Sequence, residues 1–176
     1  LLEGLRSHRI TSPSHRLSEP PSACALCHVN ESEDWIHTSL DRLFPRLARD
    51  TREEAQPLDA AITTSVAEEF ADVPFGVQRL LAGNAAERAL FARALVAPEA
   101  LALQERDVTA ALLARLADDP YAAVRRIAER SLVDLSRAPA TTPPRGASAR
   151  APALGNAARL DALERRRDDS PLVISE

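Results

Sequence analysis

The sequence predicts an all-α protein. Alanine and leucine are abundant and aromatic residues make up only 3% of the chain, a composition that favours helices over a β-sandwich. Apolar residues also recur at helical spacing through the middle of the 176 residues, and no stretch is long and apolar enough for a membrane span. We expect three regions: an extended cofactor-binding segment at 1–50, a helical module at 51–136 and a disordered tail at 137–176.

The chain opens with two similar phrases, at 8–13 and 15–20, and each begins with His-Arg and ends in proline. Proline at 13, 20 and 21 prevents a continuous helix, so this segment is predicted to be an extended arm. An extended arm can wrap a flat cofactor and present His8 or His15 to it.

A C-x-x-C-H motif follows, formed by Cys24, Cys27 and His28. Two thiols three positions apart can each add to a vinyl group of one haem, while the adjacent imidazole binds the iron. The motif therefore predicts covalent haem c, with the two cysteines as thioether anchors and His28 as the proximal ligand. Two alternatives remain open: a free or redox-active cysteine pair beside an unrelated histidine, and a structural zinc site, for which Cys27 and His28 are poorly placed.

The sixth ligand of the iron can be narrowed by elimination. The chain has no methionine and no lysine, so the iron is bound by two histidines, or by one histidine with an open or partner-supplied sixth position. We rank His8 first, His15 second and His37 third, and each of them can also be a solvated surface histidine. Ligation by two histidines predicts a low potential among c-type haems, because a thioether ligand raises it.

A helix is predicted directly after the motif. Asn30 and Glu33 have the spacing of a capping box, and Pro45 is expected to break or kink the helix. Its apolar face would consist of Ile36, Leu40, Leu43 and Leu47, with Trp35 and Phe44 at the edges. A second apolar stripe, Ile62, Val66 and Phe70, runs through 58–73.

Residues 75–135 read as two helical hairpins about 37 residues apart, which indicates a short α-solenoid. The first has a break at Gly83-Asn84; the second is capped by Asp107 and has a break at Asp119-Pro120. Residues 118–132 resemble the second helix of a HEAT repeat, by their Asp-Pro start, Val-Arg step and Ala/Leu spacing. The resemblance implies stacked helix pairs.

The N-terminal phrase 8–13, the segment 21–28 and Trp35 together resemble the last haem site of multihaem cytochromes c of the doubled C-x-x-C-H type, in which HEAT or tetratricopeptide repeats often follow. The resemblance implies that His8 is the distal ligand and that Trp35 is an aromatic neighbour of the haem. This chain differs in having a single C-x-x-C-H motif.

Proline, alanine, serine, threonine and arginine dominate after Arg137. This composition offers too little apolar surface to offset chain entropy, so 137–176 is predicted to be disordered. At most one or two undocked helical turns are expected at 156–167, with Arg165, Arg166 and Arg167 solvated.

These observations favour an electron-transfer segment over an enzyme, since no phosphate loop or nucleophile motif is present. The alternative is a protein-interaction scaffold built on the repeats, in which haem only fixes the N-terminal part. We expect redox proteins or neighbouring haems as partners, and a net charge of −4 gives no reason to expect nucleic acid. Haem c attachment further predicts an extracytoplasmic protein with a signal peptide upstream, as the C-terminal part of a longer, multihaem precursor.

Overall fold

The computed structural model describes residues 23–45, 69–139 and 157–170. These ranges hold helices and no strand, which confirms the all-α prediction for this part of the chain. The elements are α1 (Ala23–Cys27), α2 (Glu33–Leu43), α5 (Phe75–Ala82), α6 (Ala85–Ala94), α7 (Pro98–Leu101), α8 (Arg106–Ala114), the 3-10 turn η1 (Arg115–Asp118), α9 (Ala122–Arg137) and α10 (Ala157–Glu164). None of the helices in these ranges has the length and apolar character needed to cross a bilayer.

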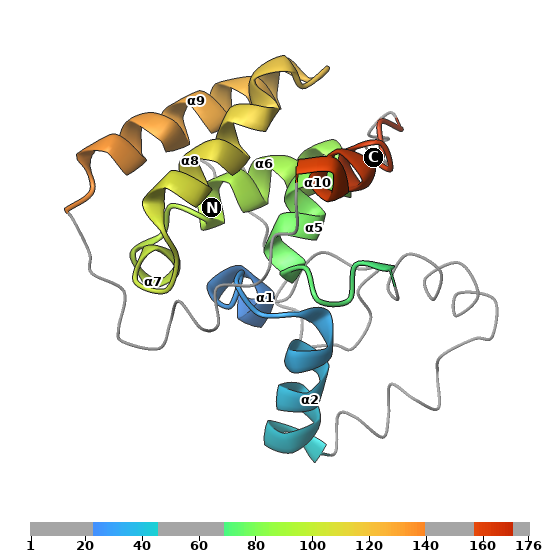
Figure 1. Ribbon diagram of the computed structural model, residues 1–176. Helices are drawn as coiled ribbons and strands as arrows, with labels where there is room; N and C mark the ends of the chain where they lie inside the picture. The colour runs from blue at the N-terminus through green and yellow to red at the C-terminus, as the bar shows by residue number, and fades with distance from the viewer. Residues whose placement is uncertain (1–22, 46–68, 140–156, 171–176) are drawn as a thin grey trace, which may run out of the picture.

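Helix α5 lies at the centre of the molecule (Figure 1). It packs against α6 on one side and against α10 on another, while α6 also contacts α9, and α9 contacts α8. The short helix α1 packs below α5 and α6, and α2 projects away from the body. The segment that carries the C-x-x-C-H motif is therefore attached to the end of the molecule opposite α8 and α9.

The predicted break at Gly83-Asn84 is confirmed, and a capping box produces it. Asn84 Oδ1 accepts a hydrogen bond from the Glu87 N–H, and Glu87 Oε2 accepts one from the Asn84 N–H, each at 3.0 Å. This arrangement satisfies two N–H groups at the start of α6. The predicted apolar residues Val77, Leu80 and Leu81 are buried in α5.

The second break, at Asp119-Pro120, is also confirmed, because η1 ends at Asp118 and α9 begins at Ala122. The predicted cap at Asp107 is wrong. Helix α8 begins at Arg106 and places Asp107 inside its first turn, where the carboxylate faces the positive end of the helix dipole. Helix α7, which starts with Pro98, was not predicted.

The N-cap of α2 lies two residues after the predicted cap at Asn30. Ser32 is the N-cap, and its Oγ accepts a hydrogen bond from the Trp35 N–H at 3.2 Å. Ile36 and Leu40 are buried as predicted, but Leu43 is 69% exposed, because α2 projects beyond the body at this end. The predicted stripe at 58–73 lies mostly outside the described residues; Phe70, within them, is buried.

The predicted disorder of the tail is wrong for residues 157–170. Helix α10 packs against α5, and its Leu163 is only 1% exposed. Arg166, predicted to be solvated, pairs with Glu69, and Arg167 pairs with Asp169. The ion pair between Arg166 and Glu69 of the body therefore adds to the small apolar surface that this segment buries. Residues 140–156 and 171–176 lie outside the described residues.

Buried apolar side chains from all of these parts form one cluster. Phe75 and Phe91 lie at its centre, with their rings edge to face and their centroids 5.7 Å apart. Gln78, also buried, donates from Nε2 to the carbonyl oxygens of Phe70 and Val73 at 3.0 and 2.9 Å. The turn before α5 is therefore fixed to α5 itself.

Candidate functional site

Helix α1 contains both cysteines of the motif. Positions 24 and 27 are one turn apart, so they lie on the same side of this helix. Cys27 is exposed and has no disulfide partner among the described residues, and His28, directly after the helix, is exposed as well. Ala25, in contrast, is fully buried. Helix α1 therefore packs on the body through one side and leaves the Cys27 thiol and the His28 imidazole accessible.

Two backbone hydrogen bonds attach the residues after the motif to the start of α5. The Gly76 N–H donates to the Val29 carbonyl at 3.1 Å, and the Phe75 N–H donates to the Glu31 carbonyl at 2.9 Å. These N–H groups are at the start of a helix, where they have no partner within it. Val29 is fully buried at this contact. The motif is therefore followed directly by backbone that is hydrogen-bonded to the start of α5.

Glycine is required at position 76 for steric reasons. A Cβ atom there would lie 2.6 Å from the Val29 carbonyl oxygen and 2.8 Å from the Val29 Cβ. The two backbones can approach this closely only because the side chain is absent. Sequence reasoning missed Gly76 and Val29; the available signal was a glycine at the second position of a predicted helix, where its low propensity needs a reason.

The structure places Trp35 beside His28. Their ring centroids are 4.9 Å apart and their planes are inclined by 43°. Trp35 is in the first turn of α2, where its N–H donates to the Ser32 Oγ of the cap. With 37% of its surface exposed, Trp35 still offers an accessible ring. Cys27, His28 and Trp35 therefore form one accessible group.

The other predicted ligands are not part of this group. His37 is two residues after Trp35 in α2, about 200° further around the helix, so it lies on a different side of α2. His8, His15 and the side chain of Cys24 lie outside the described residues. Within the ranges that are described, no three His, Cys, Asp or Glu side chains are arranged to hold a metal ion.

A partly buried acid lies at the start of α2. Burial raises the pKa of the Glu33 carboxyl above its ordinary value, and the Arg79 guanidinium opposes this shift. Arg79 itself lies 5.0 Å from the centre of the Phe75 ring and 3.3 Å from Glu87. The positive charge of Arg79 therefore partly offsets the effect of burial on the Glu33 carboxyl, which lies a few residues after the motif.

A cleft of about 340 Å³ borders α1 on the side of α6 and α7. It is lined by Leu26, Leu90, Arg93, Ala94, Val96, Ala97 and Pro98. Leu26 lies between Ala25 and Cys27 in the sequence, so the cleft extends to the motif from the side of α6 and α7. Arg93, at its edge, is paired with Asp134 of α9.

No family model, curated protein or solved structure matches this chain. The function proposed below rests on the residues of the chain and on their arrangement.

The donor set fits covalent haem. Cys27 offers an accessible thiol and His28 an accessible imidazole, and Cys24 is one helical turn earlier in the chain. These are the residue types that two thioether bonds and one iron ligand would use. A flat ring system can lie against the side of α1 on which Cys27 is exposed, because Ala25 fills the contact with the body.

Proposed function

We propose that this chain is a c-type cytochrome segment in which Cys24 and Cys27 attach one haem and His28 binds its iron. The observation that carries the proposal is the exposure of Cys27 and His28 on the outer side of α1, while Ala25 packs inward. A bound haem supplies reversible one-electron transfer. The chain supplies attachment, one axial ligand and the surroundings of the ring.

Each neighbouring residue has a defined part in this proposal. The hydrogen bonds from Phe75 and Gly76 restrain the backbone after His28, which limits how far the imidazole can move. Trp35 packs on His28 at a centroid distance of 4.9 Å and shields one side of it from water. A less hydrated ligand environment is one of the factors by which a protein sets a haem potential.

For the sixth position we propose His8, with His15 and His37 as the alternatives. The same proposal makes the protein extracytoplasmic, with redox proteins or neighbouring haems as partners, and makes this chain the C-terminal part of a multihaem cytochrome. The helices from α5 to α9 would then be a HEAT-like module behind the haem. The packing of α5 on α6, of α8 on α9, and of α6 on α9 supports that module.

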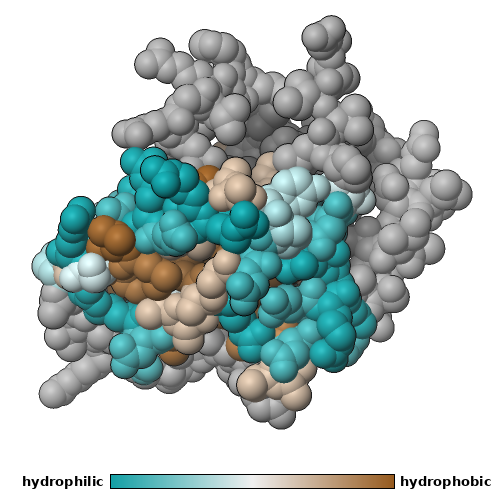
Figure 2. All heavy atoms as spheres, turned by 90° about the horizontal axis from the view of Figure 1, so that it is seen from above, coloured by the Kyte–Doolittle hydropathy of each residue, from teal (hydrophilic) through white to brown (hydrophobic). Residues whose placement is uncertain are grey.

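A second candidate function is protein binding by the helical module, with haem as a structural element. The cleft beside α1 favours it, because its lining is mostly apolar. The face of the molecule in Figure 2 also shows a hydrophobic area bordered by hydrophilic residues. A partner that buries apolar surface would gain most at such places.

The first experiment is production of the chain together with a haem c maturation system. We expect haem to stay attached after denaturation, and the double variant Cys24→Ala/Cys27→Ala to lose it. His37→Ala serves as the control and should keep covalent attachment. Absence of covalent haem from the unaltered chain would end the cytochrome proposal.

A second measurement separates the two candidate functions. If the chain transfers electrons, a small soluble reductant should reduce the iron quickly, because a haem on the outer side of α1 has an accessible edge. Slow reduction of a firmly attached haem would instead favour the scaffold.

A further inference from the structure

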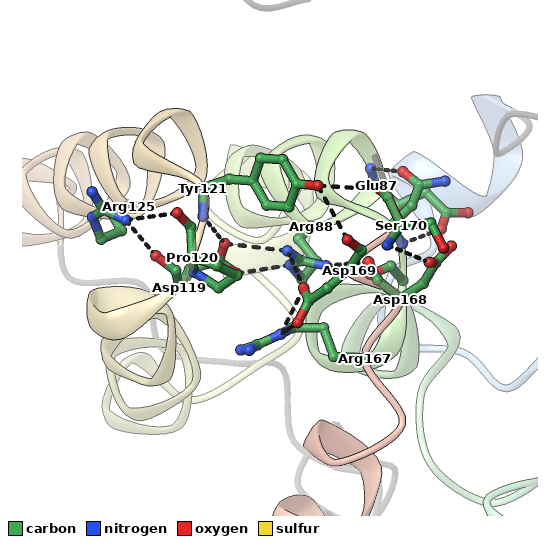
Figure 3. A network of polar contacts seen from close by, with 12 residues as sticks. Glu87, Arg88, Asp119, Pro120, Tyr121, Arg125, Arg167, Asp168, Asp169 and Ser170 are labelled. Atoms are coloured by element: carbon green, nitrogen blue, oxygen red, sulfur yellow. Dashed lines mark hydrogen bonds and ion pairs between the residues drawn. The ribbon is translucent and has the colours of Figure 1, made fainter. Parts of the chain in front are cut away.

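The C-terminal strap, defined as residues 157–170, consists of α10 and the six residues that follow it. Its backbone meets the end of α5, where the Asp168 N–H donates to the Ala82 carbonyl at 3.1 Å. It ends beside Arg88 of α6 and Tyr121 at the start of α9 (Figure 3). The strap therefore joins elements that are distant from it in the sequence.

Arg88 is the centre of this contact, and its side chain is fully buried. A guanidinium has five N–H donors, and each of them is used. Nε and Nη2 donate to Asp119 at 2.7 and 3.2 Å, and Nη1 donates to the Gly83 carbonyl at 2.7 Å. The remaining two donors bind the strap: Nη1 binds the Asp168 carbonyl at 2.9 Å, and Nη2 binds Asp169 Oδ1 at 3.1 Å.

Most of the hydrogen bonds of the Arg88 guanidinium are made with the body. Asp119 accepts from Arg88 and from the Tyr121 N–H at 2.9 Å, while Arg125 donates to the Asp119 carbonyl. Three of the five guanidinium donors are thus fixed without the strap. The other two point to the same side, an arrangement that matches paired oxygen acceptors.

Tyr121 adds a further donor to the same site. Its hydroxyl lies 3.1 Å from the Ser170 carbonyl oxygen and 3.3 Å from that of Asp169. The ring of Tyr121 also lies 5.7 Å from the Arg88 guanidinium carbon. Arg88 and Tyr121 together therefore bind backbone carbonyls and one carboxylate of an acidic segment.

The other end of the strap is held by charged groups around Phe70. The guanidinium carbons of Arg159 and Arg166 lie 5.6 and 5.0 Å from the centre of the buried Phe70 ring. Arg159 also pairs with Asp72, and Arg166 pairs with Glu69. Both acids are more than half exposed, so salt screens these two pairs.

In the middle of the strap the signs are reversed: here the strap supplies the acids and the body supplies the arginine. Arg115 of η1 donates to Asp161 at 2.7 Å and to Glu164 at 2.8 Å. Leu163, between these acids, is the one strap side chain that is buried. The strap thus has one fully buried apolar side chain, with Leu160 and Ala162 partly buried beside it, and several ion pairs. We expect its attachment to weaken at high salt, because salt screens the exposed pairs.

We propose that Phe70, Asp72, Arg88, Arg115 and Tyr121 form a reversible binding site for a helical peptide that ends in an acidic pair. In this structure the chain's own strap occupies the site, with Asp168-Asp169 as the acidic pair. Two observations carry this inference: the two N–H groups of Arg88 that bind the strap, and the oppositely charged side chains that pair across the contact. The proposal does not depend on haem.

The single tyrosine of the chain provides a direct measurement. In protein labelled with carbon-13 at the tyrosine ring, Tyr121 gives one set of signals, which reports whether its hydroxyl is bonded to the strap. We expect a shift toward a released state between about 0.05 and about 0.5 M salt, because the Debye length shortens over this range. A signal that stays constant across this range would overturn reversibility.

Peptide binding tests the site itself. In full-length Leu163→Ala/Asp169→Asn, the strap is weakened and a labelled peptide with the sequence of 157–170 should bind at least about tenfold tighter than to the unaltered chain, where the tethered strap competes. Adding Tyr121→Phe to this background should weaken the peptide, whereas adding Asp134→Asn, a surface change on α9, should not. Equal affinity for the weakened and unaltered chains would overturn the proposal. If the double variant fails to fold, the salt dependence of Tyr121 in the unaltered chain decides.

Discussion

Arg88 Nε and Asp119 Oδ2 are 2.7 Å apart, although 31 positions separate the two residues in the sequence and neither side chain has any exposed surface. The pair connects α6 to the turn before α9 and thereby fixes the two predicted hairpins to each other. Asp119 also accepts from the Tyr121 N–H at 2.9 Å, so one carboxylate both caps a turn and neutralises a buried cation.

Asp119→Asn should be among the most destabilising single substitutions in the chain. It keeps an acceptor for the Tyr121 N–H but removes the buried counter-ion of Arg88 and leaves only the partly exposed Asp169. Breaking a buried pair in this way costs about 3 to 5 kcal/mol in comparable cases. Urea denaturation measures the change. Asp134→Asn is the matched control, because it removes an exposed pair with Arg93 and should cost at most about 1 kcal/mol. Equal effects of the two variants would contradict the role given to the buried pair.

Gly76→Ala should separate the motif segment from α5. Its new methyl group would lie 2.6 Å from the Val29 carbonyl oxygen, and overcrowding of this kind costs about 1 to 3 kcal/mol. Hydrogen exchange should show faster exchange of the Phe75 and Gly76 amides, which donate across this contact. Ala86→Ser, at an exposed position of α6, should leave both amides protected. Unchanged protection in Gly76→Ala would show that the contact can be relieved by a small backbone shift.

Acid should release the strap. The hydrogen bond from Arg159 lowers the pKa of the Asp72 carboxyl below its ordinary value of 3.8, and hydrogen bonds from Ser170 lower the pKa of Asp168 in the same direction. Asp168 and Ser170 both belong to the strap, so of these two contacts it is the Asp72–Arg159 pair that stabilises docking. This stabilisation is present above pH 3.8 and is lost as the pH falls through the lowered pKa of Asp72. The tyrosine signal follows the transition, and circular dichroism separates it from global unfolding.

Asp72→Asn is the variant that tests this assignment. It should dock the strap more weakly at neutral pH and show a smaller further change on acidification. An acid transition of full size in Asp72→Asn would contradict the role given to Asp72.

Replacement of His8 tests the proposed sixth ligand. In haem-loaded protein, His8→Ala should convert a six-coordinate low-spin absorption spectrum to a high-spin one, because the sixth position becomes open or water-bound. An unchanged spectrum would direct attention to His15 or His37, each of which can be replaced in the same way.

Local sequence signals predicted much of the helical framework. Asn84 and Asp119 act within three residues of their own positions, so turn and capping chemistry could be recognised without knowing the rest of the fold. The same reasoning misplaced the start of α2, because Asn30 and Ser32 are both good caps and the choice between them depends on where the Val29 and Glu31 carbonyls meet α5.

The strap could not be predicted from composition. A count of apolar residues finds little between 157 and 170, whereas the segment is held by pairs such as Arg159 with Asp72, 87 positions apart. Arg88 likewise reads as a surface residue of an alanine-rich helix, and only the fold shows that acceptors from three separate segments surround it. The C-x-x-C-H spacing predicts haem attachment without any knowledge of the fold, and this stays a prediction.

Helix α5 is attached to other segments at both ends: at its start the Phe75 N–H donates to the Glu31 carbonyl and the Gly76 N–H to the Val29 carbonyl, and at its end the Ala82 carbonyl accepts from the Asp168 N–H. Its eight residues therefore form a spacer of fixed length between the C-x-x-C-H motif and the strap. Inserting one residue would rotate one attachment relative to the other by about 100° and move it by about 1.5 Å. Among related sequences, changes in chain length should accordingly fall in the connections and leave this helix at constant length.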